Sequence, residues 1–200
     1  MGDTFRLLVT ASRIYGAPDV IETAFAQVRA AHPRERIVLM HGKCDPRHPE
    51  KMDPAKPGEH LRIPWADAQM LPPAQQMRLL SGDWLADRIA RTLGWGIEAF
   101  PAQWAKHGNA AGVIRNSRMA ATRPPECSAF LASGQLNRGT LDCAGKALAA
   151  GSLVVFWCDQ DSQGRPWPCR NHSLQAVIRA WDAKARRVRQ QEAAQGELPL

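Results

Sequence analysis

The sequence predicts a three-layer α/β/α fold, in which a mainly parallel sheet of about five strands carries helices on both faces. Short apolar runs typical of buried strands alternate along the chain with segments whose apolar residues recur at helical spacing. Strands that alternate with helices pair in parallel, because each helix returns the chain to the same end of the sheet. With 200 residues, 44% of them hydrophobic, the chain can bury one sizeable core.

The pattern begins with two strands, each followed by a helix. Residues 6–10 form a short apolar strand, and the helical spacing starts about ten residues later. Residues 36–40 form the second strand, which ends at His41 and Gly42. The helix that belongs to this strand begins only near Asp83, so an insertion separates the two.

This insertion, residues 43–80, holds seven of the chain's 15 prolines and shows little sustained periodicity. Long irregular loops are uncommon inside compact domains, so we expect an arm or lid that packs on something, or a partly disordered segment. Its larger apolar residues favour packing, and residues 74–80 are expected to form a short helix; these apolar residues are Trp65, Met70, Leu71, Met77, Leu79 and Leu80.

The alternation then resumes, with strands expected at 97–100, 127–131 and 153–157 and helices at 111–121 and 140–150. Residues 1–157 are therefore expected to form one Rossmann-like domain, whose ligands bind at the carboxyl ends of the strands. Residues 158–200 follow as a turn-rich segment and a basic C-terminal helix, with one apolar face formed by Leu174, Val177, Ile178 and Trp181.

Composition narrows the class of protein. The five cysteines have no regular spacing, no secretory segment follows Met1, and no apolar run is long enough to span a membrane. We therefore expect a cytoplasmic protein without a membrane partner. The formal charge of +7 is weak evidence for nucleic-acid binding, because much of the excess lies near the C-terminus, in Lys184, Arg186, Arg187 and Arg189.

No metal or other cofactor is expected. Cys44, His48 and Cys158 invite a zinc interpretation, as do Cys169 and His172, whose spacing suits one edge of a metal site. No second close pair completes a four-ligand set, and scattered thiols in a reduced protein are usually small core residues.

Polar residues at the expected strand ends are the first site candidates. Thr10 and Ser12 let backbone amides approach a ligand while Arg13 supplies a charge, although a polar turn with a solvated arginine explains them equally well. Asp83 is a candidate acceptor for ribose hydroxyls, and helix capping is its alternative role.

The loop after residue 100 and the helix that follows it supply a second group. Trp104 suits stacking on a base, although a tryptophan is more often packed against neighbours. Arg115 and Arg118 are three residues apart and project from one side of the helix, with Asn116 between them. The guanidinium fork matches phosphate or carboxylate, whereas solvated surface charges are the alternative.

A third group lies in the loop before the helix at 140–150. Gly134 and Gly139 permit close approach of the backbone, and the helix start at Thr140 offers unpaired amides to an anion. This arrangement is a candidate phosphate loop. A plain turn with Thr140 as the N-cap is the commoner explanation of such a glycine pair.

Together these segments resemble the YspA-like (cpYpsA-related) SLOG family, most specifically through residues 100–104 (Phe-Pro-Ala-Gln-Trp) and 114–119 (Ile-Arg-Asn-Ser-Arg-Met). The resemblance implies a Rossmann-like domain that binds or senses a nucleotide-derived ligand containing ribose phosphate, with His41 and Gly42 in the site. It also implies a homodimer. The chain departs from the family at Ala11, where a glycine is usual, and in the looser glycine pattern of residues 133–139.

A more distant similarity, to the LOG-type phosphoribohydrolases, gives the alternative function. By position Arg115 is similar to the catalytic arginine of those enzymes, and Asp142 stands where their glutamate would be. This pair suits hydrolysis of an N-glycosidic bond. A third class, nucleic-acid binding, draws on the basic C-terminal helix and on kinship between this fold and DNA-processing proteins such as DprA.

Overall fold

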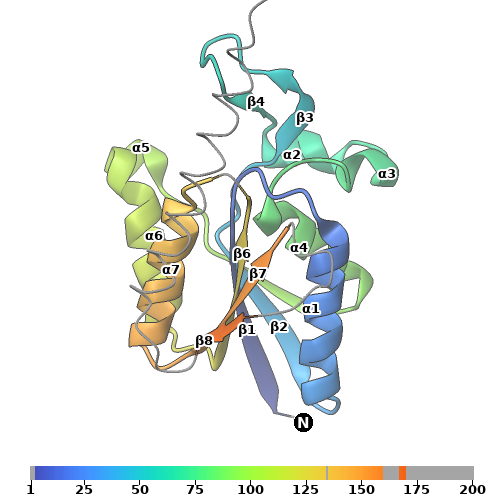
Figure 1. The fold of residues 1–200 in the computed structure, drawn as a ribbon, viewed down its shortest axis with the longest axis vertical. Helices are drawn as coiled ribbons and strands as arrows, with labels where there is room; N and C mark the ends of the chain where they lie inside the picture. Colours follow the sequence, from blue (N-terminus) through green and yellow to red (C-terminus); the bar gives the residue numbers. More distant parts are fainter. Residues whose placement is uncertain (1–2, 134, 160–166, 170–200) are drawn as a thin grey trace, which may run out of the picture.

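The computed structural model describes residues 3–133, 135–159 and 167–169 (Figure 1). The strands are β1 (Thr4–Ala11), β2 (Arg36–His41), β3 (Arg47–Met52), β4 (His60–Arg62), β5 (Gly96–Ala99), β6 (Glu126–Leu131), β7 (Leu153–Cys158) and β8 (Trp167–Cys169). The helices are α1 (Pro18–Ala31), α2 (Trp65–Gln69), α3 (Pro73–Gln76), α4 (Gly82–Thr92), α5 (Trp104–His107), a 3-10 turn η1 (Gly108–Ala110), α6 (Ala111–Ala121) and α7 (Arg138–Ala149).

The main sheet has the strand order β5-β2-β1-β6-β7-β8, and its first five strands are parallel. This confirms the predicted sheet. The chain adds β2 and β5 on one side of β1 and then crosses to place β6 on the other side. The order of strands therefore reverses between β1 and β6, and ligands of such sheets bind at this point.

β8 pairs antiparallel with β7 and was not predicted, because three residues in a turn-rich segment carry no periodic signal. The short helix α5 and the turn η1 were also not predicted, because residues 100–107 were expected to form a loop. Among the predicted strands and helices of the main sheet, α6 has the predicted bounds and the others differ by one or two residues at an end. Such differences are ordinary at the frayed ends of elements.

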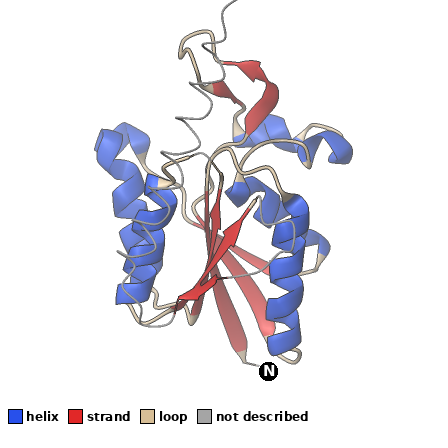
Figure 2. Cartoon of the chain, viewed as in Figure 1, coloured by secondary structure: helices blue, strands red, loops and turns tan. Residues whose placement is uncertain are grey.

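Helices cover both faces of the sheet, as Figures 1 and 2 show, with α1 and α4 on one side and α6 and α7 on the other. On the first side Ile21 and Phe25 of α1 and Leu85 of α4 pack in one buried cluster. On the second side Met119 of α6 and Leu141 of α7 belong to another. The predicted three-layer architecture is therefore confirmed.

The insertion at 43–80 is folded: it holds the separate hairpin β3–β4 and the short helices α2 and α3. The helix predicted at 74–80 starts one residue earlier and ends at Gln76, because the chain then turns so that Leu80 can bridge to Arg47. Trp65 and Leu79 are buried in the first core, whereas Met70 is 85% exposed. Trp65 and Leu79 thus attach the insertion to the domain.

Some expectations lie outside the described residues. These are the apolar face expected around Leu174 to Trp181 and the basic residues at 184–189. Of the second segment proposed at 158–200, the structure describes only residues 158, 159 and 167–169. In the described ranges, no helix combines the length and the apolar character needed to cross a bilayer.

Candidate functional site

A cavity of about 740 Å³ lies at the carboxyl edge of the sheet, where the strand order reverses. Residues 9–14 at the end of β1 line it, and so do residues 135–140 at the start of α7. Helix α6 and the hairpin β3–β4 complete its walls. Segments far apart in the sequence thus meet at one site, as expected of a parallel sheet.

Most of the predicted site residues line this cavity: Thr10, Ser12, Arg13, Gly42, Asp83, Trp104, Arg115, Asn116, Gly139, Thr140 and Asp142. Two others are not brought to it. His41 is fully buried behind the site, and Arg118 lies on a separate hollow of about 230 Å³ outside α6. Gly134 lies outside the described residues.

Arg115 is held in place by three neighbours. Its Nη1 donates to the Gly42 carbonyl and to Cys44 Sγ, both at 3.0 Å. Its Nε and Nη2 both donate to Asn116 Oδ1, at 3.1 and 2.9 Å. The Nε/Nη2 edge is the one that ordinarily binds a phosphate in bidentate fashion. Because Asn116 occupies that edge, Arg115 contributes to the cavity chiefly through its positive charge.

Asn116 connects this arginine to Asp142. It is buried, and its Nδ2 donates to the Gly139 carbonyl at 3.1 Å and to Asp142 Oδ2 at 2.9 Å. Lys146 Nζ donates to the same carboxylate oxygen at 2.8 Å. Asp142 is therefore fixed from one side by α6 and by its own helix, and the proposed catalytic pair belongs to one hydrogen-bonded network.

Asp83 connects Cys44, at the start of the insertion, to the cavity. This carboxylate is buried, lines the cavity, and accepts a hydrogen bond from Cys44 N at 3.0 Å. Ser81 rather than Asp83 caps α4, with its Oγ accepting from Trp84 N at 3.4 Å. Burial, reinforced by Asp83, raises the pKa of the Cys44 thiol to about 11 although Arg115 opposes the change. At neutral pH this thiol is protonated and is not an activated nucleophile.

The start of α7 lines one side of the cavity. Asn137 takes a left-handed conformation and its side chain bonds to both backbone groups of Ala132, at 3.1 and 2.9 Å. Asn137 therefore supplies the left-handed turn that leads into α7. Within the described ranges no side chain caps this helix, so the amides of its first turn are available to an anion. Thr140 is buried and is not the N-cap.

Arg13 and Trp104 face each other at the cavity. The Cζ atom of Arg13 lies 5.8 Å from the centroid of the Trp104 ring, and the tryptophan is 45% exposed. A loop after β1 and the short helix α5 are thus joined by a cation–π contact. The ring retains enough open surface to stack on a planar ligand.

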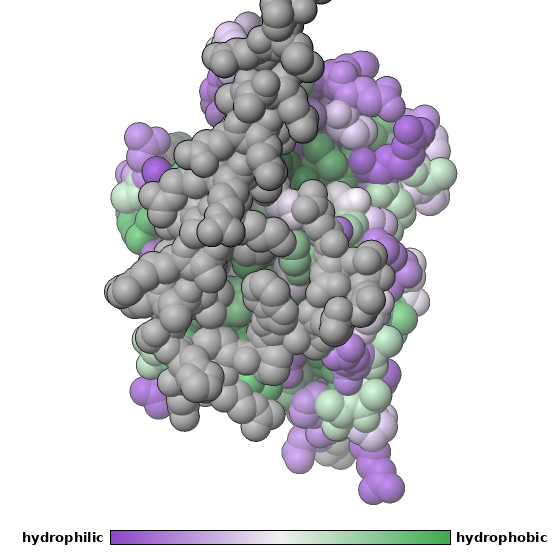
Figure 3. Space-filling model, viewed as in Figure 1, coloured by the Kyte–Doolittle hydropathy of each residue, from purple (hydrophilic) through white to green (hydrophobic). Residues whose placement is uncertain are grey.

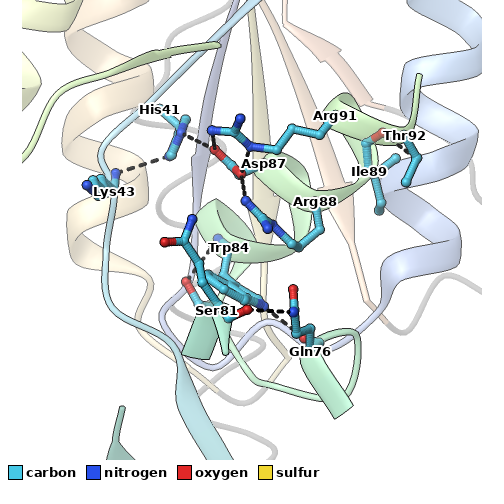
Figure 4. Close-up of polar contacts among 11 residues, drawn as sticks. His41, Lys43, Gln76, Ser81, Trp84, Asp87, Arg88, Ile89, Arg91 and Thr92 are labelled. Carbon is cyan, nitrogen blue, oxygen red and sulfur yellow. Dashed lines mark hydrogen bonds and ion pairs between the residues drawn. The ribbon is translucent and has the colours of Figure 1, made fainter. Parts of the chain in front are cut away.

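His41 belongs to a buried cluster behind the cavity (Figure 4). Its Nδ1 accepts from Lys43 N at 3.2 Å, so its Nε2 carries the hydrogen and lies 3.2 Å from Asp87 Oδ2. Arg88 and Arg91 donate to the same carboxylate. Burial by itself raises the pKa of Asp87, but the three side-chain donors outweigh it and hold this pKa well below its ordinary value. The cluster joins β2 to α4 and is structural.

Several lining residues were not singled out from the sequence, namely Arg47, Glu59 and His60 of the insertion, Asn109 before α6, and Arg138 at the start of α7. Arg138 lies next to Gly139 in the predicted phosphate loop, so its place in the sequence could have identified it as a site residue. Nothing local marks the insertion residues, because only the folding of the hairpin back over the sheet edge brings them to the cavity.

The part of the chain that the structure describes contains no group of three or more His, Cys, Asp or Glu side chains arranged to hold a metal ion. Comparison of the chain with protein-family models, with curated proteins and with solved structures finds no match. The fold and the site together define a Rossmann-like α/β protein with a polar cavity at the point where the strand order reverses.

Proposed function

We propose that the cavity binds a nucleotide-derived ligand that contains ribose phosphate. One observation carries this proposal: the first turn of α7 and the guanidinium of Arg115 line the same cavity. Helix amides and a fixed positive charge together favour a phosphate. Arg13 and Arg138 add further positive charge to the cavity lining.

The remaining lining residues suit the rest of a nucleotide. The buried carboxylate of Asp83 can accept hydrogen bonds from ribose hydroxyls, as acidic residues do in dinucleotide-binding sheets. The exposed face of Trp104 suits a base, since stacking on an aromatic ring is tolerant of base identity. This proposal agrees with the resemblance of the sequence to the YspA-like SLOG family.

A second candidate function, hydrolysis of an N-glycosidic bond, is favoured by the link from Arg115 through Asn116 to Asp142. In this reaction water adds to the anomeric carbon, the bond from that carbon to the base nitrogen breaks, and the base leaves with a proton. Asp142 would stabilise the positive charge that develops on the sugar. Release of free base from a nucleoside monophosphate, lost in Asp142→Asn, is the measurement that separates turnover from binding.

The binding proposal is tested by thermal unfolding of the purified chain with nucleotides, cyclic nucleotides and ADP-ribose. A ligand at a hundred times its dissociation constant adds about 2.7 kcal/mol to the free energy of unfolding. Arg115→Ala should abolish the shift. Arg118→Ala is the matched control, because it removes an arginine from the same helix but outside the cavity. A panel without any shift would contradict the proposal, as would a shift that survives Arg115→Ala.

A further inference from the structure

The insertion at 43–80 is fixed to the domain rather than hinged on it. Arg47 and Leu80 exchange backbone hydrogen bonds of 2.8 and 2.9 Å. Trp84 Nε1, from inside α4, donates to the Gln76 carbonyl at 2.8 Å. Trp65 is 8% exposed and packs edge-on against Trp84 with ring centroids 4.8 Å apart. Both ends of the insertion are therefore anchored in the core.

The hairpin of this insertion forms a wall of the cavity. In Figure 1 β3 and β4 stand above the carboxyl edge of the sheet, and Figure 3 shows mostly hydrophilic residues over this part of the molecule. Arg47, Gly58, Glu59 and His60 line the cavity from the hairpin. Arg47 is 9% exposed, donates to the His60 carbonyl at 2.7 Å and lies 3.4 Å from Glu59 Oε2. It therefore holds the wall together and is already neutralised.

The groups that this wall offers to a ligand are unlike those at the start of α7. The side chain of Glu59 is 51% exposed, so its carboxylate can accept hydrogen bonds from hydroxyl or amino groups. His60 also lines the cavity, although its Nδ1 is buried and has no hydrogen-bond partner among the described residues. Because Arg47 and Glu59 neutralise each other, the wall offers no net positive charge to a second anionic group. It suits an uncharged part of a ligand that is rich in hydroxyl groups.

Resting on the proposed function, we infer that the insertion makes the site select a nucleotide extended by a hydroxyl-rich group such as a second sugar. Glu59 and His60 are the residues that recognise this extension. The volume of about 740 Å³ agrees, because it lies in the upper part of the roughly 300–1,000 Å³ range of small-molecule sites. The first turn of α7 and Arg115 account only for the phosphate end of such a ligand.

The test compares ADP with ADP-ribose, in which a second ribose esterifies the terminal phosphate and thereby also removes one of its negative charges. Dissociation constants are measured by calorimetry for the wild type, Glu59→Gln, His60→Ala and Glu50→Gln. Glu50 is the matched control, because it lies in the same hairpin and pairs with Arg78 but does not line the cavity. We expect Glu59→Gln to reduce the preference for ADP-ribose over ADP by about tenfold. His60→Ala should act in the same direction, and Glu50→Gln should leave the preference unchanged.

Failure of this inference can be distinguished from failure of the proposed function. If both nucleotides bind the wild type and the ratio of their dissociation constants is unchanged in Glu59→Gln and His60→Ala, the inference is wrong and the proposed function stands. If these variants weaken both nucleotides equally, the wall acts on the shared part and the inference is again wrong. If neither nucleotide binds the wild type, and no other nucleotide does, both proposals fall. Thermal unfolding without ligand confirms that each variant is folded.

Discussion

The backbone of Gly42 lies directly against the guanidinium of Arg115, so closely that a Cβ atom at this position would overlap with Nη1 and Cζ. Arg115 Nη1 also donates to the carbonyl of the same glycine at 3.0 Å. The glycine at the end of β2 therefore serves the site by leaving room for the arginine side chain. This relationship joins two residues 73 positions apart in the sequence.

Gly42→Ala should displace the Arg115 guanidinium and weaken binding of a nucleotide by about tenfold or more, because the charge moves away from the start of α7. The free energy of unfolding should change much less, since the atoms that must give way belong to a flexible side chain. Calorimetry and thermal unfolding measure the two effects separately. Gly96→Ala in β5 is the control: its Cβ would meet the Val38 side chain at 3.1 Å, and Gly96 does not line the cavity. Equal affinity in wild type and Gly42→Ala would contradict the assigned role.

Asn116→Ala should lower both stability and affinity. The change leaves Arg115 Nε and Nη2 without their acceptor, at a cost of about 1–3 kcal/mol, and leaves Asp142 with Lys146 as its remaining donor. Chemical denaturation measures the loss of stability, and calorimetry with the ligand measures the affinity. Ser117→Ala, one residue along on the exposed side, should stay within about 0.5 kcal/mol of the wild type. A variant as stable as the wild type would show that the network contributes nothing.

Asp87→Asn should destabilise the protein by about 1–3 kcal/mol at pH 7, because the partly buried Arg88 loses its carboxylate, whereas the half-exposed Arg91 can be solvated by water. Since the pKa of Asp87 is depressed in the folded state, its stabilisation is complete above the pKa of an unfolded aspartate, about 3.9. It is lost as the pH falls from there through the folded-state pKa. Unfolding at pH 7, 5 and 3 should therefore show a constant difference at the two higher values and a smaller one at pH 3. The exposed Asp67, changed to Asn, should show no such pattern.

Trp104→Ala should weaken the binding of a nucleotide by about tenfold or more, because stacking on an aromatic side chain contributes about 1–3 kcal/mol per base. Since the residue is 45% exposed, the midpoint of thermal unfolding without ligand should change little. Trp104→Phe should retain most of the affinity. If Trp104→Ala binds the nucleotide as tightly as the wild type, the Trp104 ring only packs against Arg13 and has no role in binding.

The departure at Ala11 illustrates where sequence comparison stops. The family that the chain resembles usually has glycine there. In the structure, a Cβ on Gly82 at the start of α4 would overlap with the Cβ of Ala11. The close contact between β1 and α4 therefore requires glycine at position 82. Only packing between residues 71 positions apart reveals this requirement.

The sequence by itself determined the strand–helix alternation, because continuous apolar runs and a 3.6-residue period are local properties, and parallel pairing then follows from the helical connections. It also indicated most of the residues at the strand ends, since these ends must meet at one edge. Tertiary structure alone decided that His41 turns away to Asp87, that Arg118 faces another hollow, and that Glu59 joins the cavity. Side-chain direction and the path of a proline-rich insertion depend on contacts between distant segments, and no local pattern encodes them.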